Sequence, residues 1–330
     1  MKFLKYLFLS GSVLALILLF NMKERVGQNS VAFYNVENLF DTINDGSIND
    51  EDFLPTGKNS WNTKKYLIKL ENLSEVIAEL GDSDGPELLG LAEVENSRVL
   101  EDLLKTDRLR KLKYHFVHFD SRDRRGIDVA LLYKGNYFKP VLAKAFSIPN
   151  SESKSYRTRD ILFVKGIVKG DTLNLFVTHW PSRLGGKEQS EKHRIHAAKA
   201  LKNLIDSLCS SSLDNILVMG DFNDEPSDKS LSILGSSKAE LINPFKELEK
   251  QNLGTIKYKR SWNLFDQILI SKGLLDKKGL EYKKQSGDIF DPLWMHYKEE
   301  ERNGPFRTFI GQKFYGGYSD HFPVYIQLDK

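Results

Sequence analysis

Short apolar runs that begin or end at a cluster of polar residues are the feature that most limits how this chain can fold. The run at residues 216–219 leads directly into a segment with Asp221 and Asn223, two positions apart. Polar clusters flank five further runs, three at their ends and two at their starts: 31–34, 88–91, 175–177, 268–270 and 322–326. If all these ends share one rim, some strands arrive there and others leave it. The sequence therefore predicts a mixed or antiparallel sheet.

The residue types at these ends suit a metal-bound phosphate. Oxygen donors occur at Asn35, Glu37, Glu93 and Asp320. Cysteine is absent from these clusters and histidine is rare, which favours Mg²⁺ or Mn²⁺ over Zn²⁺. We expect Glu93 to be the main ligand, with Asn35 and Asp320 assisting. The alternative for any single acid is a solvated loop residue, because Asp and Asn are common where strands turn into loops.

Six pieces of the chain occur in the order seen in one known superfamily: Asn35-Val36-Glu37-Asn38, Glu93, Thr178-His179, Gly220-Asp221-Phe222-Asn223, Asp266 and Ser319-Asp320-His321. With them the chain resembles the endonuclease/exonuclease/phosphatase, or DNase I-like, superfamily from about Val31 to Leu328. The resemblance implies a four-layered α/β sandwich, in which two mixed β-sheets pack face to face with helices outside. It also implies a metal-dependent hydrolase of phosphoric esters. A non-catalytic binding module is disfavoured, because the complete residue set is present.

The resemblance assigns roles to individual residues. A phosphodiester repels an attacking hydroxide and has a poor leaving group, so the site must neutralise charge and orient a water. Asp221 would position and deprotonate that water, and Asn223 would hydrogen-bond a phosphate oxygen. His321 and the metal would stabilise the charged transition state. His179 would protonate the leaving oxygen or bind the phosphate.

Two pairs of a histidine and a carboxylate are expected to support these roles. Asp266 is the predicted partner of His321, and Asp128 is the predicted partner of His179. A carboxylate that accepts an imidazole proton fixes the tautomer and raises the basicity of the ring. Arg159 matches a position at which nucleases of the superfamily present an arginine near the scissile phosphate. Its alternative is a surface salt bridge.

The substrate is less constrained by the sequence. Arg124 and Arg125, next to Arg122, form a basic cluster that could grip a nucleic-acid backbone or be solvated. The loop after Gly287 interleaves aromatic and charged residues, which could stack on bases or cover the sheet edge. We expect a nuclease with nucleic acid as its partner. The alternative is a phosphomonoesterase or a lipid-headgroup phosphodiesterase of the inositol-phosphate or sphingomyelin type. No obligate protein partner is inferred.

Local patterns agree with an α/β fold. Two apolar stripes at helical spacing predict core-facing helices, and a shorter helix is expected near residues 99–104. The first stripe is capped by Asn62 or Thr63. The stripes consist of Leu67, Leu70, Leu73, Ile77 and Leu80, and of Ile195, Ala198, Leu201, Ile205 and Leu208. Residues 127–133 and 161–168 are predicted strands. Cys209, the only cysteine, is expected to be a buried structural thiol.

Composition and charge support one domain at residues 26–330, since no Pro- or Ser-rich linker divides it. The chain has 48 basic and 45 acidic residues. The excess lies within the first 25 residues, so the remainder is neutral and a general polyanion-coating surface is not expected.

Residues 1–25 are interpreted as a signal peptide or an N-terminal membrane anchor. Lys2 and Lys5 precede an uncharged apolar run at residues 6–22. No clear cleavage site follows the run, which is close to the length of about 20 residues that spans a bilayer. We therefore expect export, with the protein membrane-anchored, periplasmic or extracellular, and possible membrane association through residues 6–22.

Overall fold

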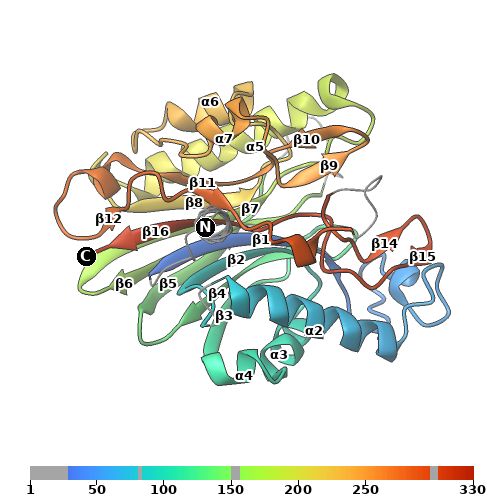
Figure 1. Ribbon diagram of the computed structural model, residues 1–330. Coiled ribbons are helices and arrows are strands. Elements are labelled where there is room, and N and C mark those ends of the chain that lie inside the picture. The colour runs from blue at the N-terminus through green and yellow to red at the C-terminus, as the bar shows by residue number, and fades with distance from the viewer. Residues whose placement is uncertain (1–28, 81–83, 150–156, 298–303) are drawn as a thin grey trace, which may run out of the picture.

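Two β-sheets pack face to face in the computed structural model of the chain, and helices cover both outer sides (Figure 1). The structure describes residues 29–80, 84–149, 157–297 and 304–330. The predicted four-layered α/β sandwich is confirmed. The expected mixture of strand directions is also confirmed, because each sheet combines one parallel pair with antiparallel pairs.

The first sheet has seven strands. Their order is β12 (Glu281–Tyr282), β16 (Val324–Asp329), β1 (Ser30–Leu39), β2 (Leu88–Val94), β4 (Asp128–Lys134) and β3 (Tyr114–His118), with β13 (Asp288–Ile289) also paired to β16. β1 and β2 are parallel and are connected through α2 (Thr63–Glu79), because parallel neighbours need a crossover. Both strands therefore end at the same rim, and the antiparallel β16 starts there.

The second sheet repeats this arrangement. Its order is β11 (Asp266–Ile270), β8 (Ile216–Asp221), β7 (Asp171–His179), β6 (Ile161–Val168) and β5 (Phe138–Phe146). β7 and β8 are parallel and are connected through α5 (Lys187–Leu208). β11 runs antiparallel to β8, so the end of β8 lies beside the start of β11.

Helices and short elements complete the layers. α2, α3 (Ser97–Lys105) and α4 (Leu109–Leu112) lie on the side of the first sheet, whereas α5, α6 (Lys229–Gly235) and α7 (Lys246–Lys250) lie on the side of the second (Figure 1). The remaining elements are η1 (Glu51–Phe53), η2 (Lys272–Leu275), η3 (Leu293–Met295) and the two hairpins β9 (Ile256–Tyr258) with β10 (Ser261–Asn263) and β14 (Phe309–Ile310) with β15 (Lys313–Phe314).

The sheets approach each other closely at the centre of the core. A Cβ added at Gly90 of β2 would lie 2.5 Å from the Met219 Sδ of β8, so a larger residue there would force the Met219 side chain to move. Every residue of β8 is buried, as its continuous apolar run predicts for a strand covered on both faces. β5, at the sheet edge, is largely exposed and carries Pro140, which lacks the N–H that a central strand needs.

The predicted helices are confirmed, with two stripe residues misplaced. Most of the stripe residues are buried, but Leu67 is 54% exposed and Leu208, at the last position of α5, is 41% exposed. Asn62 caps α2 by accepting from the Lys65 backbone N–H. Cys209 is buried, and burial raises the pKa of its thiol to about 12, as expected for a structural cysteine.

The predicted N-terminal segment lies outside the described residues. Within the ranges that the structure does describe, none of the helices is long and apolar enough to cross a membrane.

Candidate active site

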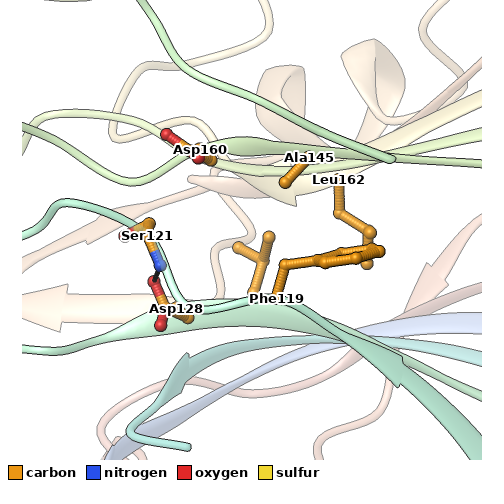
Figure 2. A pocket seen from close by; sticks show the side chains of 7 residues that line it. Phe119, Ser121, Asp128, Ala145, Asp160 and Leu162 are labelled. Carbon is orange, nitrogen blue, oxygen red and sulfur yellow. Dashed lines mark hydrogen bonds between the residues drawn. The ribbon is translucent and has the colours of Figure 1, made fainter. Parts of the chain in front are cut away.

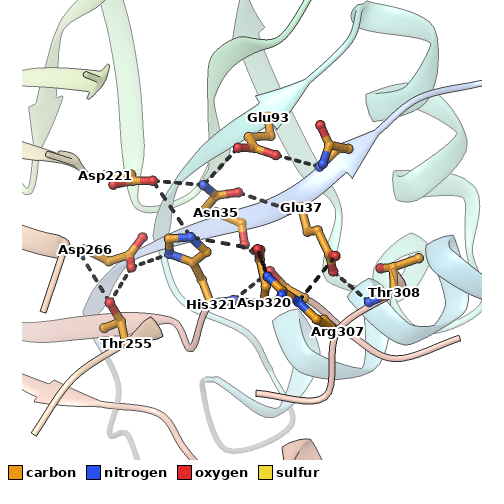
Figure 3. Close-up of polar contacts among 12 residues, drawn as sticks. Asn35, Glu37, Glu93, Asp221, Thr255, Asp266, Arg307, Thr308, Asp320 and His321 are labelled. Atoms are coloured by element: carbon orange, nitrogen blue, oxygen red, sulfur yellow. Dashed lines mark hydrogen bonds and ion pairs between the residues drawn. The ribbon is translucent and has the colours of Figure 1, made fainter. Parts of the chain in front are cut away.

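The polar ends of the strands meet where the rims of the two sheets come together (Figure 3). Two hydrogen bonds link one sheet to the other there. Asn35 Nδ2 of β1 donates to Asp221 Oδ2 of β8 at 3.0 Å. His321 Nδ1, just before β16, lies 2.6 Å from Asp266 Oδ2 at the start of β11. The sequence therefore predicted correctly that these distant segments share one rim.

The predicted pair of Asp266 and His321 is present in the structure. Asp266 is fully buried and also accepts from the Thr255 hydroxyl. Burial opposes protonation of His321, but the adjacent Asp266 carboxylate outweighs it and holds the pKa of the imidazole well above its usual value. This ring is therefore cationic at neutral pH, with its Nε2 facing Asp221 at 3.9 Å.

Asp221 lies at the centre of the cluster. Its Oδ1 accepts from the backbone N–H of Asn223, whose φ of 50° turns the chain back over the strand end. Its Oδ2 lies 3.6 Å from His179 Nε2. Burial raises the pKa of Asp221 to about 7, against the opposing effect of the His321 charge. A carboxyl tuned in this way can exchange a proton near neutral pH.

Glu93 is a half-buried carboxylate of the rim. It has a left-handed φ of 66°, and its two oxygens accept from the Asn38 backbone N–H at 2.9 Å and from Asn35 Nδ2 at 3.4 Å. Asn35 thus contacts both Glu93 and Asp221. Several negative oxygens converge here with few cations between them, which fits a divalent cation held by hard oxygen donors.

Three of the groups described above also lie close together, but the hydrogen bond between Asp266 and His321 already occupies two of them. One atom each from Asp221, Asp266 and His321 lies within 4.8 Å of the others. The donor chemistry of the rim as a whole, which is rich in carboxylate and amide oxygens, therefore fits a metal ion.

Glu37 does not point toward this group as a metal ligand would. Its Oε2 accepts from the Thr308 backbone N–H at 2.7 Å and lies 3.9 Å from Lys69 Nζ, while its Oε1 lies 4.0 Å from Arg307 Nε. Burial, followed by repulsion from Asp320, raises the pKa of Glu37 to about 7. The structure thus places Glu37 in a separate charge network that holds the segment around Thr308.

Asp320 connects that network to the rim. It forms an ion pair with Arg307, and its Oδ1 lies 3.9 Å from His321 Nε2. Burial would raise its pKa, but the charges of His321 and Arg307 lower it below the usual value. Asp320 is therefore an ionised carboxylate at the edge of the site.

The predicted pair of Asp128 and His179 is wrong. Asp128 lies 3.6 Å from His118 Nε2 and accepts from the Ser121 backbone N–H at 3.1 Å. His179 Nδ1 is buried without a hydrogen-bond partner among the described residues. β3, which ends in His118, is a neighbour of β4 in the first sheet, whereas His179 ends β7 in the second sheet. Burial, and then the charge of Arg159, hold the pKa of His179 well below its usual value.

Arg159 is a buried residue of the site and not a surface ion pair. Its Nη2 donates to the Trp180 carbonyl at 2.6 Å, and its Nη1 donates to Asp123 at 3.4 Å. Asn223 donates to the same carbonyl at 3.1 Å, so Arg159 and Asn223 flank one point of the backbone. Arg124 and Arg125 are exposed on the loop at residues 119–127, and within the described part of the chain their side chains form no hydrogen bond with the rim residues.

Sequence reasoning missed three residues of this region. Lys69 is 1% exposed in α2 and donates to Thr308 Oγ1 and to the Tyr318 carbonyl, both at 2.7 Å. The other two are Arg307, for which the loop after Gly287 predicted no specific contact, and Asp123. The one available signal was the position of Lys69 beside Leu70 and Leu73, on the apolar side of a predicted helix.

The matched family agrees with this geometry. A model described as the endonuclease/exonuclease/phosphatase family matches residues 30–330, which is nearly the whole chain. The chain belongs to this family. It is a hydrolase of phosphoric esters. The enzymes of this family depend on a divalent metal, and the rim of this chain has acidic and histidine groups able to bind one. No curated protein matches the chain in sequence.

Solved structures show the same fold at low sequence identity. A Danio rerio TDP2 complexed with a single-strand DNA product is 16% identical, with a TM-score of 0.58, and 91% of this chain and 98% of that chain are covered. A mannosyl-6-phosphatase from Bacteroides thetaiotaomicron is 17% identical, with a TM-score of 0.56 and coverage of 91% and 99%. The human Nocturnin catalytic domain with a bound sulfate is 17% identical, with a TM-score of 0.52 and coverage of 92% and 95%.

Proposed function

We propose that this protein is a Mg²⁺-dependent phosphodiesterase that hydrolyses nucleic acid, with Mn²⁺ able to substitute. The observation that carries the proposal is the rim itself. An ionisable Asp221 lies between the His321 imidazolium and the Asn35 amide, beside the carboxylate of Glu93. Such a site can accept a proton from a water on one side and neutralise a phosphate on the other.

Asp221 is the proposed general base. Its pKa of about 7 lets it accept a proton from water, and the backbone N–H of Asn223 orients it. The cationic His321, fixed by Asp266, would face the charge that develops on the phosphate. His179 is neutral at pH 7 because of burial and the nearby Arg159, which supports hydrogen bonding to phosphate over donation of a proton by an imidazolium.

Asn35 and Glu93 are the residues proposed to hold the metal ion, with Asp320 nearby. Mg²⁺ keeps several waters and takes few protein carboxylates, so one accessible carboxylate and one amide oxygen suffice. When bound, the ion would supply charge neutralisation at a phosphate oxygen. Glu37 is no longer proposed as a ligand, because the backbone of Thr308 and the side chains of Lys69 and Arg307 hold its carboxylate.

Nucleic acid is favoured as the substrate by the basic residues beside the rim. Arg159 is buried next to Asn223, and the exposed Arg124 and Arg125 lie on the loop that also carries its partner Asp123. Phosphates flanking the scissile one could contact that loop. The likeness to a TDP2 with a bound DNA product supports the same choice.

A phosphomonoesterase is the second candidate, and Arg307 is the observation that favours it. The side chain of Arg307 is 36% exposed and forms an ion pair with Asp320 at the edge of the site. A monoester carries more charge than a diester, so an additional cation at the mouth would help to bind it. The likeness to a mannosyl-6-phosphatase is compatible with this alternative.

The aromatic loop after Gly287 supports a covering role more than base stacking. Trp294 packs against Phe290 and Tyr318, with ring centroids 6.1 and 5.1 Å apart. Trp294 is 38% exposed, and the other aromatic side chains that the structure describes in this loop are half-buried.

Residues 1–25 are proposed to export or anchor a catalytic domain at residues 26–330, so the enzyme would act outside the cytoplasm. The support is the sequence pattern of Lys2, Lys5 and the apolar run at 6–22. Fractionation of cells that express the full chain would test this. Recovery in the cytosol would contradict it.

A turnover panel tests the proposed activity. Plasmid DNA, RNA, a sugar phosphate, phosphoinositides, sphingomyelin and an aryl phosphodiester would be offered with Mg²⁺, with Mn²⁺ and with a chelator. We expect cleavage of nucleic acid that the chelator and Glu93→Gln both abolish, whereas the conservative surface variant Glu101→Gln retains full activity. Turnover of the sugar phosphate alone would support the monoesterase, and turnover of a lipid alone would identify a headgroup enzyme.

A further inference from the structure

A second group of potential metal ligands lies two strands away from β1 in the first sheet. His118 ends β3, Asp128 begins β4, and Asp120 lies in the loop between them. One ligand atom from each lies within 4.8 Å of the other two. The rim chemistry described above uses none of the three.

The His118 side chain is 3% exposed, and its Nε2 is buried without a hydrogen-bond partner among the described residues. This nitrogen points toward Asp128 Oδ2 at 3.6 Å, which is too long for a hydrogen bond. Two ligands that each bind one ion at about 2.1 Å lie about 3.4 Å apart at a tetrahedral angle. The spacing thus fits a nitrogen and an oxygen that share a cation.

The carboxylate of Asp128 is also buried. Asp128 is 3% exposed, and among the described residues no lysine or arginine lies within salt-bridge distance of it. Across a small recess lies Asp160, whose buried Oδ1 has no hydrogen-bond partner there (Figure 2). A cation beside Asp128 would neutralise the charge of two carboxylates that line the same recess.

We propose that His118, Asp120 and Asp128 hold a second divalent cation, separate from the one assigned to the rim. A set of one imidazole and two carboxylates suits Zn²⁺ or Mn²⁺ better than Mg²⁺.

The ion would fasten the loop at 119–127 to the sheet. Ser121 already donates its backbone N–H to Asp128, and the Asp123 N–H donates to Ser121 Oγ at 3.1 Å. Asp123 in turn contacts Arg159 at the rim. The second cation would therefore stabilise this loop. The contact between Asp123 and Arg159 then connects the loop to the catalytic centre.

Mn²⁺ binding to the full-length protein in excess Mg²⁺ tests this proposal. Mg²⁺ would fill the oxygen-only site at the rim, so one Mn²⁺ per chain should remain bound in equilibrium dialysis. His118→Gln should weaken that binding by at least about tenfold. The matched control is His115→Gln on the same strand, an exposed residue that stacks on Tyr133 and should bind Mn²⁺ like the wild type.

Three results would overturn the proposal. The first is the absence of retained Mn²⁺ in the wild type, and the second is equal affinity of the two histidine variants. The third is loss of the retained Mn²⁺ in Glu93→Gln, which would place that ion at the rim. If His118→Gln fails to fold, by circular dichroism, Asp120→Asn decides, because the Asp120 side chain is 81% exposed and its replacement should spare the fold. Unchanged Mn²⁺ affinity in Asp120→Asn would then refute the site.

Discussion

The units β1–α2–β2 and β7–α5–β8 have the same topology, one in each sheet, but they bring different groups to the rim. The first ends in Asn35 and Glu93, an amide and an accessible carboxylate with a left-handed backbone. The second ends in His179 and Asp221, which are both buried. One repeated arrangement thus separates the proposed oxygen donors for a metal from the proposed base and the neutral imidazole beside it.

The two crossover helices show a related contrast. Each buries one cation on its inner face, Lys69 in α2 and Arg194 in α5, at 1% and 0% exposure. Lys69 binds two neutral oxygens and approaches Glu37 only to 3.9 Å. Arg194 Nε lies 2.6 Å from Asp224, next to Asn223. Both cations hold a loop that adjoins the site, but only Arg194 does so through a close ion pair.

The largest expected effect comes from removing the base of the second unit. Asp221→Asn keeps the shape of the side chain but cannot accept a proton, so kcat should fall by about 10²–10⁴-fold. Substrate affinity should change little. Single-turnover kinetics would check this, with the exposed Asp52→Asn as control. A near-normal kcat would remove Asp221 from the mechanism.

The buried cations of the two helices come next. Replacing either by methionine removes one cation beside a buried acid that keeps other partners, so the loss in the free energy of unfolding should reach at most about 3–5 kcal/mol. Arg194→Met should lie at the upper end, because its ion pair is close, and Lys69→Met at the lower end. Urea unfolding would measure both, with the exposed Lys199→Met and Lys64→Met as controls. A larger loss for Lys69→Met would reverse the comparison between the helices.

Asp266→Asn should have a smaller effect, because Asp266 acts through His321. We expect a decrease in kcat of about 10–100-fold. Asp266 raises the pKa of His321, so its loss lowers that pKa, and the decline of activity at alkaline pH should begin at a lower pH. Profiles of kcat/KM against pH would show the shift. An alkaline limb that stays in place would mean that His321 is not required in its charged form.

The smallest effect is expected at the exposed loop. If nucleic acid binds across Arg124 and Arg125, replacing both by alanine should reduce the slope of log affinity against log salt by about one to two units. Binding to labelled DNA at several salt concentrations would measure it, with exposed Lys246 and Lys250 replaced as the control pair. An unchanged slope would favour the monoesterase.

Most of the fold could be predicted from the sequence because local signals and burial agree. Strands buried on both faces need continuous apolar runs, and α2 and α5 need apolar stripes. Leu67 was misplaced because a stripe gives the face of a helix only to within one position. The residues that link the two sheets at the rim were also predicted, since each follows or precedes such a run.

The errors concern side chains that depend on tertiary contacts. Asp128 is the first residue of its strand, but the order of strands in the sheet decides which histidine it meets. Glu37 has the spacing of a ligand, yet Lys69 and Thr308, far away in the sequence, hold it elsewhere. No local pattern in the sequence records such distant partners.

The span of the rim along the chain has a consequence for synthesis. The Ser319 hydroxyl donates to the Asn35 carbonyl across 284 positions, and His321 follows every other residue of the proposed site. A ribosome must therefore translate almost the entire domain before the imidazolium can reach Asp266. A nascent chain therefore carries the earlier parts of the proposed site without its imidazolium, and the site is complete only when the chain is almost fully made.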